Sequence, residues 1–161
     1  MPATYEPIET KTIGTAIASV TFSSVPATYT DLVLVFNGTS ASNQNMELRF
    51  NGDTATNYSA TRLYGDGTSA VSDRTSTSDV MLVGNLYTTQ TANILQVMNY
   101  ANATTFKTVL CRSNNAGAQV STRVGLWRKT PEAITTILVR PAGGANFSIG
   151  CEFTLYGIKA A

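Results

Sequence analysis

Short runs in which apolar and polar residues alternate recur along the chain, and turn residues separate them. The clearest spans residues 147–155, where every odd position from Phe147 to Leu155 is apolar. Successive side chains of a strand point to opposite faces, so this spacing predicts a strand with its odd positions in a core. No window repeats apolar residues at intervals of three and four, the pattern typical of an amphipathic helix.

Other runs predict further strands. In residues 46–50 the apolar positions alternate with Glu47 and Arg49, and the run ends at the turn signal Asn51-Gly52. Residues 120–126 alternate in the same way. Residues 32–36 are apolar at every position, which predicts a central strand covered on both faces. Shorter candidate strands are residues 19–22, 59–64, 80–83, 94–99, 109–111 and 137–139.

This succession of strands and turns predicts an all-β protein, an antiparallel jelly-roll-like β-sandwich of about nine or ten short strands. Residues 13–161 form the single domain, and residues 1–12 are expected as an extended N-terminal arm. The polar stretch 65–79 is expected as one exposed loop. A two-sheet sandwich leaves unpaired edge strands, and a chain with few charges has little to guard them, which favours a homo-oligomer.

Composition narrows the range of partners. Of the 161 residues only 13% are charged, the net charge is +1, and the largest basic cluster is Arg128-Lys129. Binding of nucleic acid through phosphate neutralisation needs several cations on one face, so we expect none. The longest apolar run is far shorter than a membrane span, and the N-terminus lacks the pattern of a signal peptide, so we expect no membrane association.

The chain contains no histidine. Ser-His-Asp and Cys-His catalysis are thereby excluded, and no nucleotide-binding glycine motif is present, so we predict a non-enzymatic protein without a cofactor. A pair of carboxylates, as in glycoside hydrolysis, is the remaining catalytic option. The candidates are Glu47, Asp53, Asp66, Asp73, Asp79 and Glu152. Cys111 and Cys151 are expected as buried free thiols, with a disulfide as the alternative.

Five residues are candidates for an interface or a ligand contact: Tyr5, Tyr64, Asp66, Trp127 and Arg128. Trp127 has two interpretations, an exposed platform for a sugar or a packed ring whose indole N–H finds a partner at the rim of the core. Asp66, with Ser69, Asp73 and Asp79, could bind calcium, although a solvated turn explains the same residues. No metal site is assigned.

Several segments resemble a group of small jelly-roll-like structural proteins of tailed bacteriophages, which serve as decoration or tail-associated proteins. The resembling segments are MPATYEPI (1–8), PATYTDL (26–32), RFNGD (49–53), NYS (57–59), RLYGDG (62–67), VGLW (124–127) and FTLYGI (153–158). They span nearly the whole chain, so the resemblance concerns the fold.

The resemblance implies a virion protein made in the host cytoplasm. The leading hypothesis is a capsid decoration (cement) protein, a homotrimer bound to the major capsid protein or other virion proteins, with the arm reaching to a neighbour. The alternative is a tail-fibre or baseplate protein that binds host-surface glycans through Tyr64, Trp127 and residues 65–79.

Overall fold

The chain folds into two antiparallel β-sheets that pack face to face as a jelly-roll-like β-sandwich. The computed structural model describes residues 4–115 and 117–159. The strands are β1 (Tyr5–Thr12), β2 (Val20–Phe22), β3 (Asp31–Gly38), β4 (Gln44–Phe50), β5 (Tyr58–Gly65), β6 (Ala70–Ser78), β7 (Met81–Leu86), β8 (Thr91–Val97), β9 (Lys107–Asn115), β10 (Gln119–Trp127), β11 (Ile137–Pro141) and β12 (Glu152–Ile158), with one 3-10 turn, η1 (Ala142–Gly144).

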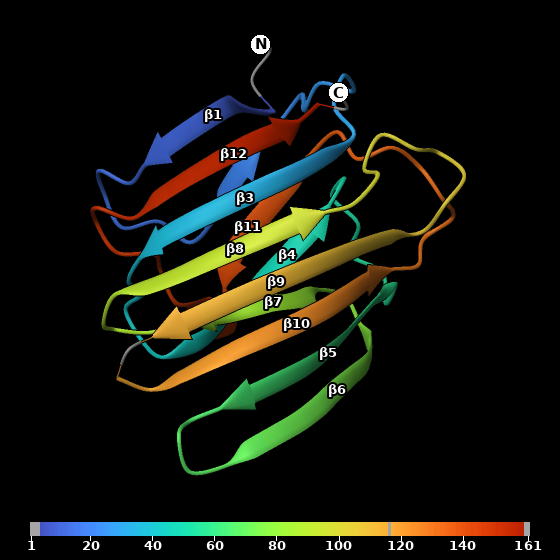
Figure 1. The fold of residues 1–161 in the computed structure, drawn as a ribbon. Coiled ribbons are helices and arrows are strands. Elements are labelled where there is room, and N and C mark those ends of the chain that lie inside the picture. Colours follow the sequence, from blue (N-terminus) through green and yellow to red (C-terminus); the bar gives the residue numbers. More distant parts are fainter. Residues whose placement is uncertain (1–3, 116, 160–161) are drawn as a thin grey trace.

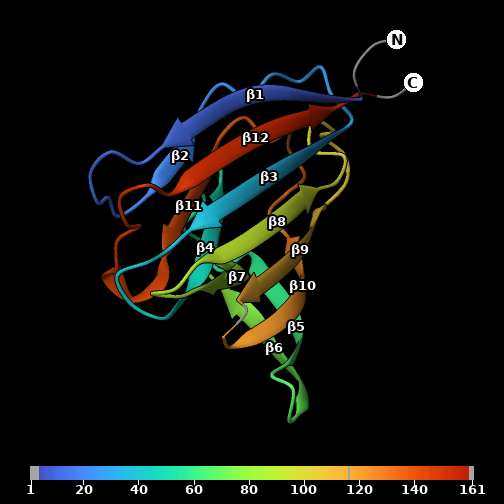
Figure 2. The same ribbon diagram turned by 60° about the vertical axis from the view of Figure 1, so that its left-hand side comes forward.

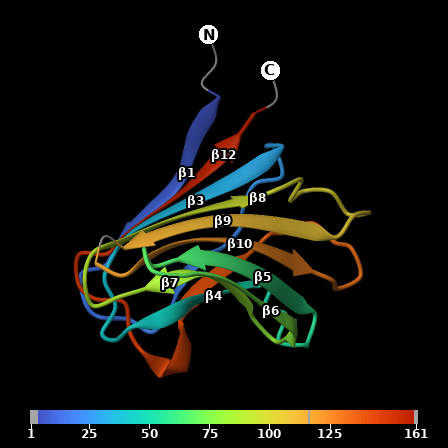
Figure 3. The same cartoon turned by 60° about the horizontal axis from the view of Figure 1, so that its bottom comes forward.

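The two sheets differ in size. The large sheet has eight strands in the order β1-β12-β3-β8-β9-β10-β5-β6, and the small sheet has four in the order β2-β11-β4-β7 (Figure 1). Figure 3 shows the sheets as two layers, with β4 and β7 beneath β9 and β10. β7 packs against β9, β10 and β5. β6 lies beyond the small sheet, so its residues are mostly exposed on both faces.

The core lies between the two sheets, where both contribute their inward positions. Met46, Leu48 and Phe50 of β4 are all buried, as the alternation of that run predicts. In β3, Leu32, Leu34 and Phe36 point into the core. β3 is also central, as predicted, since β12 and β8 pair with it on either side. Aromatic contacts such as Phe36–Phe153, with ring centroids 4.8 Å apart, fill this interior.

The described residues form twelve strands, more than the predicted nine or ten, because two segments were not expected as strands. The stretch 65–79, expected as a loop, is largely β6, which pairs with β5. A strand exposed on both faces needs no apolar alternation, so its polar sequence carried no strand signal. The β5–β6 hairpin projects past the small sheet (Figure 2).

The second unexpected strand is β1, which comprises residues 5–12 of the predicted arm. It pairs with β12 of its own chain along its whole length. The other edge of β1 is free. It is interrupted by Pro7 and by a register shift between Pro7 and Glu9, and it carries the ion pair of Lys11 with Glu9. Proline, bulges and charges are the usual means of keeping an edge strand from pairing with another chain.

One predicted strand begins later than expected. The alternation from Phe147 predicts a strand over residues 147–155, but β12 begins at Glu152. Residues 148–151 form a turn, with Gly150 at a φ of 85°. Phe147 and Cys151 are buried as expected, whereas Ile149 is 68% exposed, so its assignment to the core was wrong.

Candidate functional site

The outer face of the large sheet, turned away from the small sheet, carries unusually many apolar side chains. In a strand with one covered face, apolar side chains usually point inward, but in β10 two valines point outward. Ser121, Arg123 and Trp127 point inward and are buried, while Val120 and Val124 point outward and are 62% and 50% exposed. Figure 1 looks onto this face. The sequence pattern of residues 120–126 therefore places apolar side chains away from the core.

Strand register brings further apolar side chains beside those of β10. Thr122 lies opposite Leu63 of β5 on one side and opposite Arg112 of β9 on the other, and Arg112 lies opposite Ile94 of β8. Val124 lies opposite Leu110. We call the resulting surface the outer patch, defined by Leu63, Ile94, Leu110, Val120 and Val124. Of these, Leu63 is 55% and Ile94 38% exposed.

A shallow hollow of about 840 Å³ lies over the part of the outer face formed by β5, β6, β8, β9 and β10. Leu63, Ile94 and Val120 contribute to its lining, and Arg112 is its one charged lining residue. The Arg112 guanidinium has no hydrogen bond or ion pair with any described residue. The hollow is thus an apolar surface with a single cation, suited to contact with another protein surface.

The structure places Trp127 in the core, 2% exposed. Its ring packs against Phe50 and stacks on Tyr58, with centroid distances of 5.4 and 6.3 Å. Its indole Nε1 donates a hydrogen bond of 2.7 Å to Oδ2 of Asp53. This is the packing interpretation of the tryptophan, and it leaves no exposed indole platform for a sugar.

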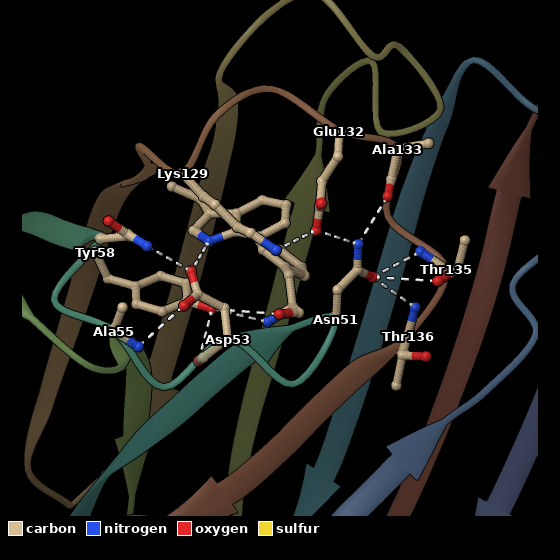
Figure 4. Close-up of polar contacts among 12 residues, drawn as sticks. Asn51, Asp53, Ala55, Tyr58, Lys129, Glu132, Ala133, Thr135 and Thr136 are labelled. Carbon is tan, nitrogen blue, oxygen red and sulfur yellow. Dashed lines mark hydrogen bonds and ion pairs between the residues drawn. The ribbon is translucent and has the colours of Figure 1, made fainter.

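The turn after β4 is held by the side chains of Asn51 and Asp53 (Figure 4). The Asn51 amide donates to Glu132 and to the carbonyl of Ala133, and its oxygen accepts from the N–H groups of Thr135 and Thr136. Asn51 has a φ of 50°, a conformation that asparagine tolerates better than most residues. Since these polar atoms bond one another, this corner serves to fix the segment that follows β10.

The Asp53 carboxylate is a further acceptor at this corner. It receives hydrogen bonds from Trp127, from the amide of Asn57 and from the backbone N–H of Ala55. Partial burial acts to raise its pKa, but the bonds from Asn57, Trp127 and Ala55 together act more strongly, and the pKa is lowered.

The other candidate contact residues lie at separate places. Tyr64 packs under the guanidinium of Arg62, 4.2 Å from the ring centroid. Tyr64 lies opposite Ser121 of β10. Ser121 is six residues along the strand from Trp127, so Tyr64 lies roughly 20 Å from the tryptophan. Arg128 donates to the carbonyl of Ser76.

Tyr5 lies on β1 with its ring edge-to-face against Tyr156. The structure therefore brings Tyr64 and Asp66 together at one hairpin, and Trp127 and Arg128 together at the other end of the same ladder.

Asp66 serves the β5–β6 turn. Its Oδ1 accepts hydrogen bonds from the backbone N–H groups of Thr68 and Ser69, and these bonds are the main reason that its pKa is far below the ordinary value. Asp73 pairs with Arg62, and Asp79 pairs with Arg49. Within residues 4–115 and 117–159, no three His, Cys, Asp or Glu side chains are grouped as metal ligands.

Glu47 and the two cysteines are also committed to the fold, whereas Glu152 is exposed at the start of β12. Glu47 pairs with Arg140. Cys111 and Cys151 are both free and buried, as expected, and burial raises the pKa of Cys111 to about 12. No described helix has the length and apolar character needed to cross a membrane. No protein-family model matches the chain, and no curated protein matches it either.

Sequence reasoning missed the outer patch, although a signal was present. In residues 120–127, Arg123 and Trp127 share one face of the strand, and Val120 and Val124 share the other. The continuous apolar run of β3 is a second signal, since it predicts a cover on both faces. The small sheet covers only one of them.

Proposed function

We propose that the chain is a non-enzymatic structural component of a tailed-phage virion, a capsid decoration protein that attaches to the head through the outer patch. The observation that carries this proposal is the apolar outer face of the large sheet. The resemblance of the sequence to phage structural proteins supports an assembly of this kind, and the exposed apolar side chains support the outer patch as the contact surface.

The size of the outer face suits an interface. The whole outer face, eight strands about 4.8 Å apart and about eight residues long, covers roughly 1,000 Å², and the outer patch lies on four of these strands, β5, β8, β9 and β10. A standard protein–protein interface takes about 800 Å² from each partner. Charges are depleted at the core of such interfaces, and Arg112 is the one charged residue that lines the hollow over the outer patch. A partner surface with one carboxylate opposite Arg112 would complete the contact.

The partner in this proposal is the major capsid protein, with decoration subunits grouped as homotrimers on the head. In this proposal the contact is the outer patch and not the predicted arm, because residues 5–12 of the arm pair with β12 of the same chain. A glycan contact formed by Tyr64 and Trp127 together is not favoured, because roughly 20 Å of ladder separates them and the indole is buried.

A matched pair of lysine substitutions tests the proposal. Val124→Lys places a charge in the outer patch, whereas Ile149→Lys places the same charge on an exposed turn outside it. Each purified variant is added to heads that lack this protein, and bound copies per head are counted by quantitative mass spectrometry.

We expect Ile149→Lys to bind at the wild-type level and Val124→Lys to lose at least about tenfold in affinity, the effect of an unpaired charge at an interface core. Equal occupancy by both variants would show that the outer patch is not the contact. Failure of the wild-type protein to coat heads at all would overturn the decoration role.

A further inference from the structure

A polar pocket of about 240 Å³ lies where the free edge of β7 meets β5 and β10. Its lining includes Asn43, Asn45, Arg62, Tyr87 and Gln119. Arg62 is the neighbour of Leu63 in β5, so it points to the opposite side of the large sheet from the outer patch. Nothing in the proposed attachment to a capsid uses this pocket.

Directly behind the pocket wall lies a buried positive charge. Arg123 is 3% exposed, and its Nη2 donates to Oδ1 of Asn45 at 2.6 Å and to Oδ1 of Asn85 at 2.7 Å. Its Nε has no hydrogen-bond partner, and no carboxylate of a described residue forms an ion pair with it. Burial, followed by the nearby charge of Arg62, lowers the pKa of Arg123 to about 10, so the group is still protonated near neutral pH.

An uncompensated buried charge is costly, and a native structure that retains one usually supplies a counter-charge from elsewhere. The single negative charge of Asp73 cannot neutralise both arginines, because Asp73 forms its ion pair with Arg62. The region formed by Arg62, Asp73 and Arg123 therefore carries one net positive charge beside an open pocket. An anion in the pocket would balance it.

The internal hydrogen bonds also decide which atoms face the pocket. A guanidinium only donates, so Asn45 must turn its oxygen toward Arg123, and its NH₂ group is left without a partner among the described residues. Asn43 uses its oxygen to accept from the N–H of Thr88. Tyr87 accepts from Gln119, which leaves its own proton to donate. The lining thus presents donors from two amides, a phenol and Arg62.

We propose that this pocket binds an acidic saccharide through its carboxylate. Asn43, Asn45, Tyr87 and Arg62 would donate to the carboxylate oxygens, while the amide of Gln119 would bond a sugar hydroxyl. Drug-sized ligands occupy pockets of about 300–1,000 Å³, so a pocket of this size suits a single sugar ring. Four donors around one site also match the acceptor-only chemistry of an ionised carboxylate.

The test compares two Asn→Asp substitutions in the purified protein. Asn45→Asp keeps the side-chain shape, lets its carboxylate pair with Arg123, and puts a negative charge where the ligand would bind. Asn114→Asp makes the same charge change on the exposed outer face of β9 and serves as the control. Binding of glucuronate is measured by NMR titration, with glucose and inorganic phosphate as comparison ligands.

We expect wild type and Asn114→Asp to bind glucuronate, and Asn45→Asp to lose about tenfold or more in affinity while its Tm stays at or above that of wild type. If Asn45→Asp fails to fold, Asn43→Asp at the exposed rim gives the same comparison. Absence of glucuronate binding by wild type, or equal binding by wild type and the pocket variant, would overturn the site. Phosphate or glucose binding as tight as glucuronate binding would overturn the assignment to an acidic saccharide.

Discussion

Along β10, neighbouring residues meet two different environments. The inner phase holds Arg123, Gly125 and Trp127 against the small sheet, and each has a specific contact there. The outer phase holds Val120 and Val124, which are half exposed or more and have no layer over them. In an isolated sandwich the apolar phase would be the covered one. The difference shows that the valines of β10 lie on the open face of the sheet, where the proposed attachment would cover them.

The largest expected effect comes from the inner phase. Trp127→Ala removes a ring packed on Phe50 and Tyr58 and leaves the Asp53 carboxylate without one of its donors. We expect a loss of about 3–5 kcal/mol in the free energy of unfolding, measured by urea denaturation followed by circular dichroism. Trp127→Phe, which keeps much of the ring but not the N–H, is the control and should lose less. A loss below about 1 kcal/mol in Trp127→Ala would contradict the packing role.

The next effect concerns acid stability. Because the pKa of Asp53 is lowered in the folded state, its contribution to stability is complete above the ordinary carboxyl pKa, near pH 4, and is lost as the pH falls through the lowered folded value. Asp53→Asn should lower stability by about 1–3 kcal/mol at pH 7. It should also flatten the decline in Tm below about pH 4. An unchanged pH dependence would show that the hydrogen bonds of Asp53 do not favour its ionised form.

The smallest effects compare two adjacent positions. A methyl group on Gly125 would lie 2.2 Å from the sulfur of buried Met81, so Gly125→Ala should cost about 1–3 kcal/mol through overpacking. Val124→Thr, one residue earlier on the outer face, should change stability by less than about 0.5 kcal/mol. Both are measured by chemical denaturation of the purified protein. Equal losses at the two positions would remove the distinction between the faces.

Much of the fold could be predicted from the sequence because most strands have one clear apolar phase. The alternation in β4 gave the correct inward residues, and the doubly apolar run of β3 gave its central position. The phase of β10 could not be predicted in the same way. Arg123 is accommodated in the interior by Asn45 and Asn85, which are distant in the sequence and become neighbours only when both sheets are assembled.

The candidate site was harder to predict for a related reason. The outer patch consists of residues from β5, β8, β9 and β10, none of which is notable by itself. Their association depends on strand order, and the pairing of β5 with β10 crosses more than fifty residues of sequence. Aromatic residues such as Trp127 drew attention because of their chemistry, yet local hydrogen bonds and packing account for them.

The pairing of β1 with β12 has a consequence for how the chain folds during synthesis. Tyr5 lies opposite Ile158, so β1 acquires its partner only after the ten strands between them in the sequence have been made. β12 also lies between β1 and β3, and until it is released from the ribosome the exposed edge of β3 has no partner on that side. Contacts this distant in sequence slow folding. The nascent chain therefore presents an open sheet edge until β12 emerges, and an unpaired sheet edge is prone to aggregation and to chaperone binding.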